Sequence, residues 1–198
     1  MAEITAKMVK ELRDKTGAGM MDCKKALAKC DGDVDKALKH LRELGIASAA
    51  KKVGRATSEG LIFSYIHPGD KLGVMIEINC ETDFVARTDD FREFAKDIAM
   101  QVAAADPRVV SREELSPEII EAEKEIYRNL ALKEGKPEKI LDKIVDGRIE
   151  KFYGEACLME QAFVKDTDRT ISEVVTDTIA KIGENIQVRR FVRFRLGE

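Results

Sequence analysis

Few of the side chains that commonly carry catalysis lie close together in this sequence. It holds four cysteines and two histidines, namely Cys23, Cys30, Cys80, Cys157, His40 and His67. No two cysteines form a C-x-x-C pair, and neither histidine stands near a cysteine along the chain. We therefore expect neither a zinc site nor a Cys–His dyad. The cysteines are predicted to be buried thiols in a reducing cytoplasm.

Sequence motifs that bind nucleotides or catalyse hydrolysis are also absent. The chain has no G-x-x-x-x-G-K-[ST] phosphate loop, no Rossmann glycine fingerprint, no G-x-S-x-G and no H-E-x-x-H. The chain is therefore not itself a GTPase. We expect no enzyme activity of its own, no catalytic residue, no cofactor and no metal.

The first segment that does not resemble ordinary core is LRDKTGAGMMDCKKAL, from Leu12 to Leu27. On a helical wheel Met21 lies nearly opposite the apolar stripe of this helix, and Met20 lies at the flank of the stripe. Two interpretations are open. The helix starts later and both methionines fill a small bundle, or they form an adaptable apolar contact for a partner.

The second such segment is EINCETDFVAR, from Glu77 to Arg87. A strand is predicted to end at Cys80, and Thr82 can cap a helical turn that starts at Asp83. Phe84 then lies at the tip of a strand-to-helix connection, where functional residues concentrate. The alternative, which the pattern alone slightly favours, is that Phe84 folds back onto the core with Phe91.

The elements before the second segment predict a small helical bundle and a linker. Thr5 can cap a first helix, and Gly17 and Gly19 interrupt it. A second helix follows, and Asp33 caps a third that Gly45 is predicted to stop. We assign residues 1–45 to this three-helix domain and residues 46–59 to the linker.

The rest of the chain, residues 60–198, is predicted to be an α+β core. Period-two alternation on both sides of Pro68-Gly69-Asp70 predicts a hairpin, and a last strand completes an antiparallel sheet of at least three strands. In that last strand Ile186, Val188, Val192 and Phe194 share one parity. Helices flank the sheet.

Two of these helices are predicted to form an antiparallel hairpin over about 116–153. Ser116-Pro117 starts the first, Gly135-Lys136-Pro137 separates the two, and apolar stripes line each helix. The stripe of the first helix is Ile119, Ile126 and Leu130, and that of the second is Leu141, Ile144, Val145, Ile149 and Phe152.

Composition places the chain among soluble globular proteins. Of 198 residues, 36% are charged and 44% hydrophobic, with a formal net charge of -3. No apolar run is long enough to span a membrane. Met1 to Lys10 lacks the apolar stretch of a secretory signal, so we expect this segment to stay in the mature protein and the location to be cytoplasmic.

Three segments together resemble the signature motifs of the bacterial elongation factor Ts family. They are the two segments quoted above and KIGENIQVRRF, from Lys181 to Phe191, in the family's order. The resemblance covers essentially the whole chain. It implies an N-terminal domain like a ubiquitin-associated domain, a linker, and an α+β dimerisation core with a protruding helical hairpin.

The resemblance also implies a function in translation elongation. The family binds elongation factor Tu, the GTPase that delivers aminoacyl-tRNA, disturbs its magnesium and phosphate site, and speeds GDP release so that GTP can bind. The motif-matched residues for exchange are Thr82, Asp83, Phe84 and Val85. In the family the phenylalanine wedges into an apolar pocket of the GTPase, and the aspartate helps to shift the helix that supports the magnesium site.

By the same resemblance, Arg13, Met20 and Met21 lie where the N-terminal domain touches the GTPase. The chain departs from longer family members, which carry two similar half-cores. Its 198 residues leave room for one. Short members are expected to form homodimers that supply the second half.

A nucleic-acid-binding protein is the competing interpretation. Arg189, Arg190, Arg193 and Arg195, with Phe191 and Phe194 between them, resemble a basic aromatic strand of an RNA-binding sheet. A solvated sheet face explains the same residues, and we favour it, so no direct nucleic-acid contact is expected. Peptide binding through the N-terminal helices is a third interpretation, which rests on fold analogy alone.

Overall fold

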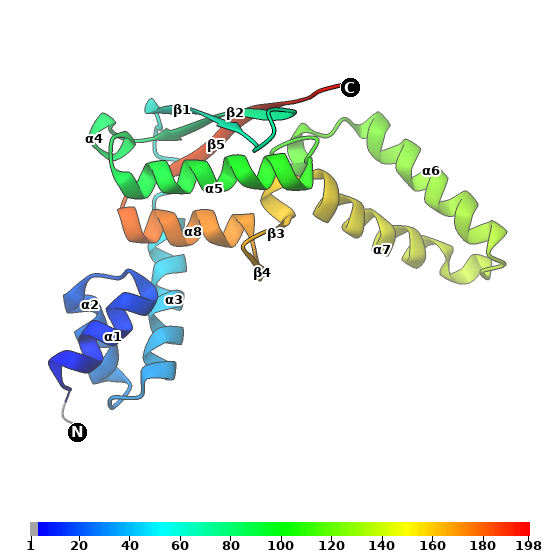
Figure 1. Ribbon diagram of the computed structural model, residues 1–198. Coiled ribbons are helices and arrows are strands. Elements are labelled where there is room, and N and C mark those ends of the chain that lie inside the picture. The colour runs from blue at the N-terminus through cyan, green and yellow to red at the C-terminus, as the bar shows by residue number, and fades with distance from the viewer. Residues whose placement is uncertain (1–3) are drawn as a thin grey trace. The chain divides into compact units, whose positions relative to one another are not determined.

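The computed structural model describes residues 4–198 as a mixed α+β protein (Figure 1). Residues 1–3 lie outside the described residues, and with them part of the predicted polar N-terminal segment. The chain divides into two compact units. Unit 1 comprises the chain up to Leu61, Asn79–Phe94 and Glu173–Gln187, and unit 2 comprises Ile62–Ile78, Ala95–Ser172 and Val188–Glu198.

Three helices form the N-terminal bundle of unit 1, as predicted: α1 (Ala6–Thr16), α2 (Met20–Lys29) and α3 (Val34–Ala50). The Thr5 hydroxyl accepts a hydrogen bond from the Met8 N–H at the start of α1. Gly17 ends α1 in the left-handed conformation, with φ of 66°. The bundle core is Val9, Leu12, Cys23, Ala26, Leu27, Ala37 and Leu41.

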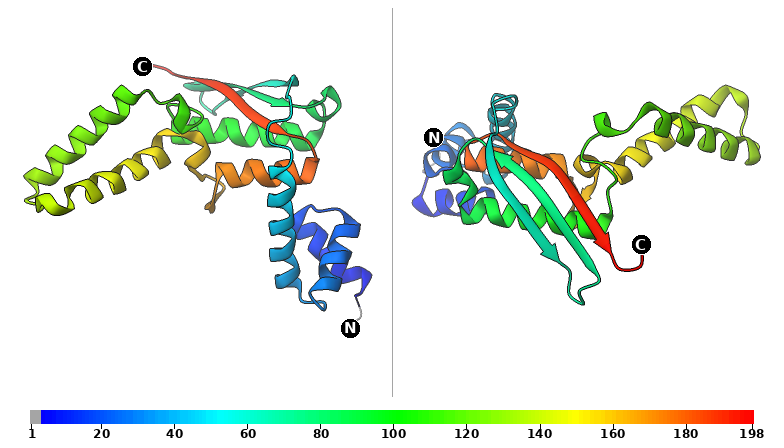
Figure 2. Two further views of the ribbon diagram at one scale, coloured as in Figure 1. Left: turned by 180° about the vertical axis from the view of Figure 1, so that it is seen from behind. Right: turned by 90° about the horizontal axis from the view of Figure 1, so that it is seen from above.

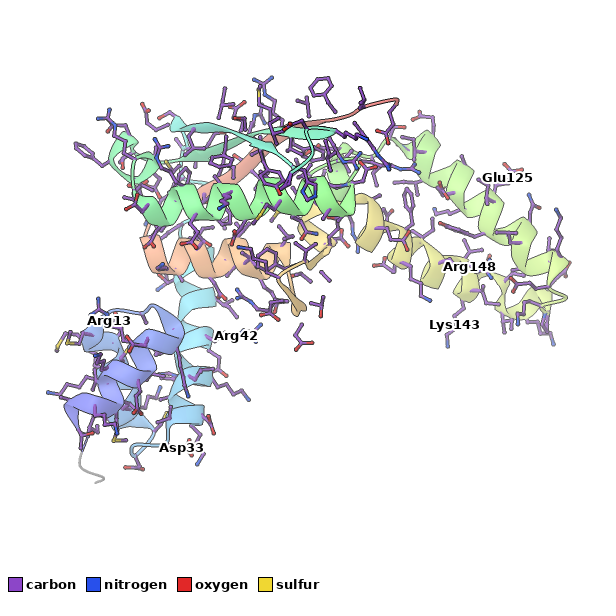
Figure 3. The ribbon with its side chains drawn as sticks, viewed as in Figure 1. Arg13, Asp33, Arg42, Glu125, Lys143 and Arg148 are labelled. Carbon is purple, nitrogen blue, oxygen red and sulfur yellow. The ribbon has the colours of Figure 1, made fainter. Side chains whose placement is uncertain are left out.

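The third helix is capped at Asp33, labelled in Figure 3, whose Oδ1 accepts a hydrogen bond from the Lys36 N–H at 3.0 Å. This bond lowers the pKa of the Asp33 carboxyl. The predicted stop at Gly45 is wrong, because α3 continues to Ala50. A Cβ on Gly45 would lie 3.3 Å from the Cβ of Ala180, so the glycine allows close approach to a neighbouring helix.

The main sheet contains β1 (Glu59–Ile66), β2 (Leu72–Cys80) and β5 (Ile186–Arg195), in the order β1-β2-β5. Neighbouring arrows run in opposite directions in Figure 2, so the predicted antiparallel sheet is confirmed. Gly69 and Asp70 adopt positive φ in the hairpin turn. Helix α5 (Asp89–Ala105) lies along one face of the sheet in Figure 1. Val74 and Ile76 of β2 and Ile98 and Val102 of α5 are buried.

The other face of the sheet, in unit 2, is apolar and exposed. Its residues, which we call the outer apolar face, are Ile62, Ile66, Met75, Val192 and Phe194. The prediction that Ile186, Val188, Val192 and Phe194 lie on one face of β5 is therefore wrong for the last two residues. Ile186 and Val188 are buried, but Phe194 is 71% exposed.

The alternation of β5 shifts at two arginines. Arg189 and Arg190 are both exposed. Beyond them the Arg193 side chain is only 12% exposed, and its Nε donates to the Ala103 carbonyl of α5 at 3.4 Å. Arg193 thus takes an inward position that strict alternation from Ile186 would give to Val192.

The helical hairpin consists of α6 (Pro117–Lys133) and α7 (Glu138–Ala156), and it too is confirmed. The predicted stripe of α7 is buried at Leu141, Val145, Ile149 and Phe152. Arg148, labelled in Figure 3, donates to Glu134 across the hairpin at 2.9 Å.

The predicted stripe of α6 is wrong. Ile119, Ile126 and Leu130 are exposed, whereas Ala131 is buried. Ile120 and Tyr127 are the residues of α6 that pack on the cluster around Phe152. The sets 119/126/130 and 120/127/131 have identical helical spacing, so periodicity alone does not choose between them.

The remaining elements of the described chain are α4 (Asp83–Ala86), η1 (Arg112–Glu114), η2 (Leu158–Glu160), β3 (Ala162–Phe163), β4 (Asp166–Thr170) and α8 (Ile171–Ile182). Strands β3 and β4 form a second, antiparallel sheet that was not predicted. Arg112 braces the base of the hairpin, because it pairs with Glu150 and Glu160 and lies 4.1 Å from the Tyr153 ring. Within residues 4–198 no helix is long and apolar enough to cross a membrane.

Candidate partner-binding site

The segment Thr82–Val85 forms a single helical turn between β2 and α5. β2 ends at Cys80, and Thr82 is extended, with φ of -128°. Its hydroxyl accepts a hydrogen bond from the Val85 N–H at 3.4 Å, which caps α4 as predicted. Ala86 is buried and Val85 half-buried, so the turn is anchored on its inner side. We call Thr82–Val85 the tip.

Phe84 projects from the tip into solvent and is 81% exposed. The interpretation that it folds back onto the core is wrong. Phe91 is instead fully buried and lies next to Phe94, with 6.5 Å between ring centroids. A large aromatic side chain held in water on an ordered turn contributes nothing to the core, so its exposure points to a role in binding.

Asp83 lies beside Phe84 in the first turn of α4. Its Oδ2 accepts a hydrogen bond from Arg87 Nη2 at 2.7 Å, and both side chains remain partly exposed. Such an exposed i,i+4 pair is weak, so a partner can take over either member at low cost. Asp83 is therefore available as an acceptor at the tip.

The tip is also held by residues from distant segments, which the sequence does not predict. The Glu184 carboxylate, between α8 and β5, accepts hydrogen bonds from the N–H groups of Glu81 and Thr82 and from the Thr82 hydroxyl. Glu81 in turn accepts from the Asn185 N–H. These partners lie more than 100 positions apart along the chain, so no local pattern joins them. The one available signal is that Glu184 and Asn185 stand inside the third motif, KIGENIQVRRF.

The N-terminal candidates lie on the bundle. Met20 and Met21 open α2 and are 59% and 64% exposed, so the interpretation that they fill the bundle is wrong. Arg13, labelled in Figure 3, is exposed near the end of α1. The structure therefore gathers Thr82, Asp83, Phe84 and Val85 in one turn and places Arg13, Met20 and Met21 on the helices of the bundle.

Three of the four arginines of β5 pair with acids. Arg190 pairs with Glu77 at 2.7 Å, and Arg193 pairs with Asp106 at 3.3 Å. Arg195 pairs with Glu198 at 3.3 Å. A strand that binds RNA needs free positive charge beside exposed aromatic rings. Acids beside three of these arginines reduce the local positive charge, which favours a solvated sheet face over the RNA-binding interpretation.

The cysteines are thiols without disulfide partners. Cys23, Cys80 and Cys157 are buried, as predicted, whereas Cys30 is half-buried. Burial raises the pKa of both Cys80 and Cys157 to about 11, which disfavours the reactive thiolate. Among residues 4–198 no cluster of three His, Cys, Asp or Glu side chains could hold a metal ion.

Comparison with known proteins decides the family. The model of the family described as Elongation factor TS matches residues 3–198. The chain belongs to the elongation factor Ts family. Membership makes it a factor of translation elongation in protein biosynthesis, and the resemblance of the three motifs is confirmed.

Curated relatives agree over the full length of the chain. Elongation factor Ts of Desulforamulus reducens is 64% identical over 198 residues, which cover 100% of this chain and 91% of the relative. That of Heliobacterium modesticaldum is 63% identical over 195 residues, covering 98% and 91%. That of Desulfosudis oleivorans is 57% identical over 198 residues, covering 100% of both chains. These elongation factor Ts chains are thus close to this one in length.

Proposed function

We propose that this chain is a guanine-nucleotide exchange factor for elongation factor Tu. It binds the GDP form of the GTPase in the cytoplasm, disturbs the magnesium and phosphate site, and promotes GDP release so that GTP can bind. The observation that carries this proposal is the 81% exposure of Phe84 on a capped turn beside Asp83. It acts through binding and makes or breaks no covalent bond.

The energy that the tip must supply is modest. A GDP complex of nanomolar affinity has a binding free energy of about -12 kcal/mol, and each tenfold loss of affinity requires about 1.4 kcal/mol. Coupling is reciprocal, so the factor weakens GDP binding by as much as GDP weakens binding of the factor. An aromatic side chain that fills a partner's pocket contributes about 2–4 kcal/mol. Phe84 alone therefore accounts for a change in GDP affinity of about 30-fold or more.

Asp83 acts beside the wedge. Its carboxylate gives up or shares its hydrogen bond with Arg87. It then accepts a hydrogen bond from the helix that supports the magnesium site of the GTPase. A loosened magnesium ion no longer compensates the charge of the phosphates, so GDP dissociates faster. Thr82 caps the turn, and Val85 anchors it against the protein.

The N-terminal bundle tethers the complex. Met20 and Met21 offer flexible apolar contact, and Arg13 offers a guanidinium for a hydrogen bond. In this proposal residues 1–45 form the tethering domain, residues 46–59 the linker and residues 60–198 the exchange and dimerisation core. The linker begins inside α3, which runs to Ala50.

We also propose that the chain forms a homodimer through the outer apolar face. Five apolar side chains on that face are exposed. Two copies related by a two-fold axis bring the same apolar patch together, and such a contact is self-complementary. The elongation factor Ts relatives described above are close to this chain in length. Longer members of the family carry two half-cores in one chain, so in this proposal a second copy supplies the second half-core.

Release of a fluorescent GDP analogue from elongation factor Tu tests the exchange function. Substoichiometric amounts of the protein are expected to accelerate release, and added free magnesium is expected to oppose the acceleration. A folded protein that leaves the release rate unchanged would contradict the proposal. Acceleration only at stoichiometric amounts would contradict the turnover that an exchange factor requires.

A further inference from the structure

The tip is held by one carboxylate that comes from the far end of the chain. Glu184 lies in the short connection between α8 and β5. Its Oε2 accepts hydrogen bonds from the N–H groups of Glu81 and Thr82, both at 3.0 Å. Its Oε1 accepts from the Thr82 hydroxyl at 2.6 Å. A carboxylate that accepts three such charge-assisted bonds fixes both the position and the direction of the chain at Thr82.

The bond to the Thr82 hydroxyl also orients the cap of α4. A hydroxyl has one proton to donate, and here that proton points to Glu184. The lone pairs of the oxygen are then free to accept from the Val85 N–H at 3.4 Å. Glu184 thereby fixes the side chain that starts the turn from which Phe84 projects.

A reciprocal contact runs in the opposite direction. Oε1 of Glu81 accepts a hydrogen bond from the Asn185 N–H at 2.6 Å. The same carboxylate lies 3.5 Å from Nη1 of Arg55, whose carbonyl accepts from Asn185 Nδ2 at 2.9 Å. Neighbouring residues, Glu81–Thr82 on one side and Glu184–Asn185 on the other, are therefore joined by two carboxylates that point opposite ways.

We propose that Glu184 is a positioning residue for nucleotide exchange, which holds the tip so that Phe84 meets the GTPase in its bound orientation. This inference rests on the proposed function, in which Phe84 is the wedge. A wedge on a loose turn must be ordered during binding, and that cost reduces the energy left to weaken GDP. Glu184 removes the cost by ordering the turn in the free protein.

Three variants test the inference. Glu184→Ala removes all three acceptor contacts, whereas Glu184→Gln keeps a carbonyl oxygen for the two backbone N–H groups. Glu93→Ala removes an exposed acid from α5 in the same unit and serves as the charge control. Each protein is titrated against elongation factor Tu loaded with the fluorescent GDP analogue, so that the maximal release rate and the half-saturating concentration are obtained separately.

We expect Glu184→Ala to lower the maximal rate about tenfold and to change the half-saturating concentration much less, because the N-terminal contacts remain. Glu184→Gln recovers part of the rate, and Glu93→Ala matches the unmodified protein. In a Phe84→Ala background, Glu184→Ala has no further effect on the rate. Additive losses in the double variant would show that Glu184 does not act through Phe84, and would overturn the inference.

Amide hydrogen exchange supplies a readout that needs no partner. Glu184→Ala is expected to lose protection at Glu81, Thr82 and Val85 while the amides of α6 and α7 keep theirs. If protection is lost at the tip and the exchange rate is unchanged, the positioning role is wrong. If the unmodified protein does not accelerate GDP release from elongation factor Tu, the proposed function is wrong. The amide protection then still tests whether Glu184 orders the tip.

Discussion

At the scale of single residues, the candidate site is defined by side chains whose exposure has no structural reason. Phe84 is exposed while Phe91, seven positions later, is fully buried. Met20 and Met21 are exposed while Cys23 in the same helix is buried. In each case the chain carries a good core residue and keeps it in water, which is the usual sign of a binding surface.

The methionines are predicted to contribute to affinity and not to folding. Met20→Ala and Met21→Ala each remove apolar surface that is buried in the complex. Each is expected to lose about 1 kcal/mol of binding free energy, which raises the dissociation constant about fivefold. Since both side chains are exposed, the free energy of unfolding should change by less than about 0.5 kcal/mol. Titration calorimetry with elongation factor Tu measures the first quantity and urea denaturation the second. Lys29→Ala, on the same helix, is the control, and unaltered affinity in both methionine variants would exclude the two methionines from the interface.

The two buried thiols are predicted to resist modification in the native protein. Burial raises the pKa of Cys80 and Cys157 to about 11 from an ordinary value of 9.0. The thiolate fraction at pH 8 is then about 100-fold smaller than for an unperturbed thiol. Iodoacetamide labelling followed by mass spectrometry should find both residues unmodified until urea unfolds the chain. Rapid native labelling at either position would show that the thiol is not buried.

The same shift sets a direction for stability at high pH. The folded pKa lies above the unfolded one, so the native state holds these protons more tightly. The resulting stabilisation is complete below pH 9 and is lost as the pH rises toward 11. Denaturation midpoints should therefore fall across this interval.

At the scale of elements, most helices and strands could be predicted from caps, glycines and apolar spacing. The bundle helices, the hairpin of β1 and β2, and the paired helices α6 and α7 all follow from such local signals. The errors have a common physical origin. Because glycine commonly ends helices, the sequence predicts a stop at Gly45. The close approach of Gly45 to Ala180 is a tertiary contact that no local pattern shows.

The buried face of an element could not be predicted where two residue spacings were equivalent, as in α6, or where the strand was irregular, as in β5. The exposed stripe of α6 and its buried one have the same spacing, one residue apart. In β5 the two exposed arginines, Arg189 and Arg190, displace the alternation. For the candidate site, the tip and its cap could be predicted from EINCETDFVAR, but the contacts of Glu184 could not, since they depend on distant segments.

A buried glutamine pair is predicted to fix α5 to the segment that follows the hairpin. Gln101 is fully buried, donates to Gln161 Oε1 at 3.0 Å and to the Ala162 carbonyl at 3.1 Å, and accepts from the Val164 N–H at 2.8 Å. Gln101→Leu leaves these partners unsatisfied in the interior and should lower the free energy of unfolding by about 3 kcal/mol. Urea denaturation measures the loss, with Met100→Leu on the same helix as the control. A loss below about 0.5 kcal/mol would mean that water replaces the amide.

At the scale of the whole molecule, different surfaces are proposed to bind different partners. Unit 1 contains the tip, the methionines and the residues that brace the tip, and unit 2 contains the outer apolar face and the helical hairpin. One surface is thus proposed to meet the GTPase and another to meet a second copy. Substitutions on the two surfaces should therefore be separable.

The outer apolar face is predicted to hold two copies together. Phe194→Glu places a charge in the centre of an apolar contact and should convert a dimer to a monomer at micromolar concentration. Sedimentation equilibrium measures the mass directly. Ile126→Glu, at an exposed apolar position of α6, is the matched control and should remain dimeric. A monomeric unmodified protein, or a Phe194→Glu variant that stays dimeric, would rule out this interface.

Phe84 is proposed to drive GDP release, and a kinetic comparison of three proteins tests this role. The rate of fluorescent GDP release from elongation factor Tu is measured with catalytic amounts of the unmodified protein, of Phe84→Ala and of Ile126→Ala as a control for loss of an exposed apolar side chain. We expect Phe84→Ala, with an unchanged unfolding midpoint, to lose about 2 kcal/mol of coupling and to accelerate release about 30-fold less, while Ile126→Ala keeps the full rate. A Phe84→Ala protein that releases GDP within about twofold of the unmodified rate would contradict the claim.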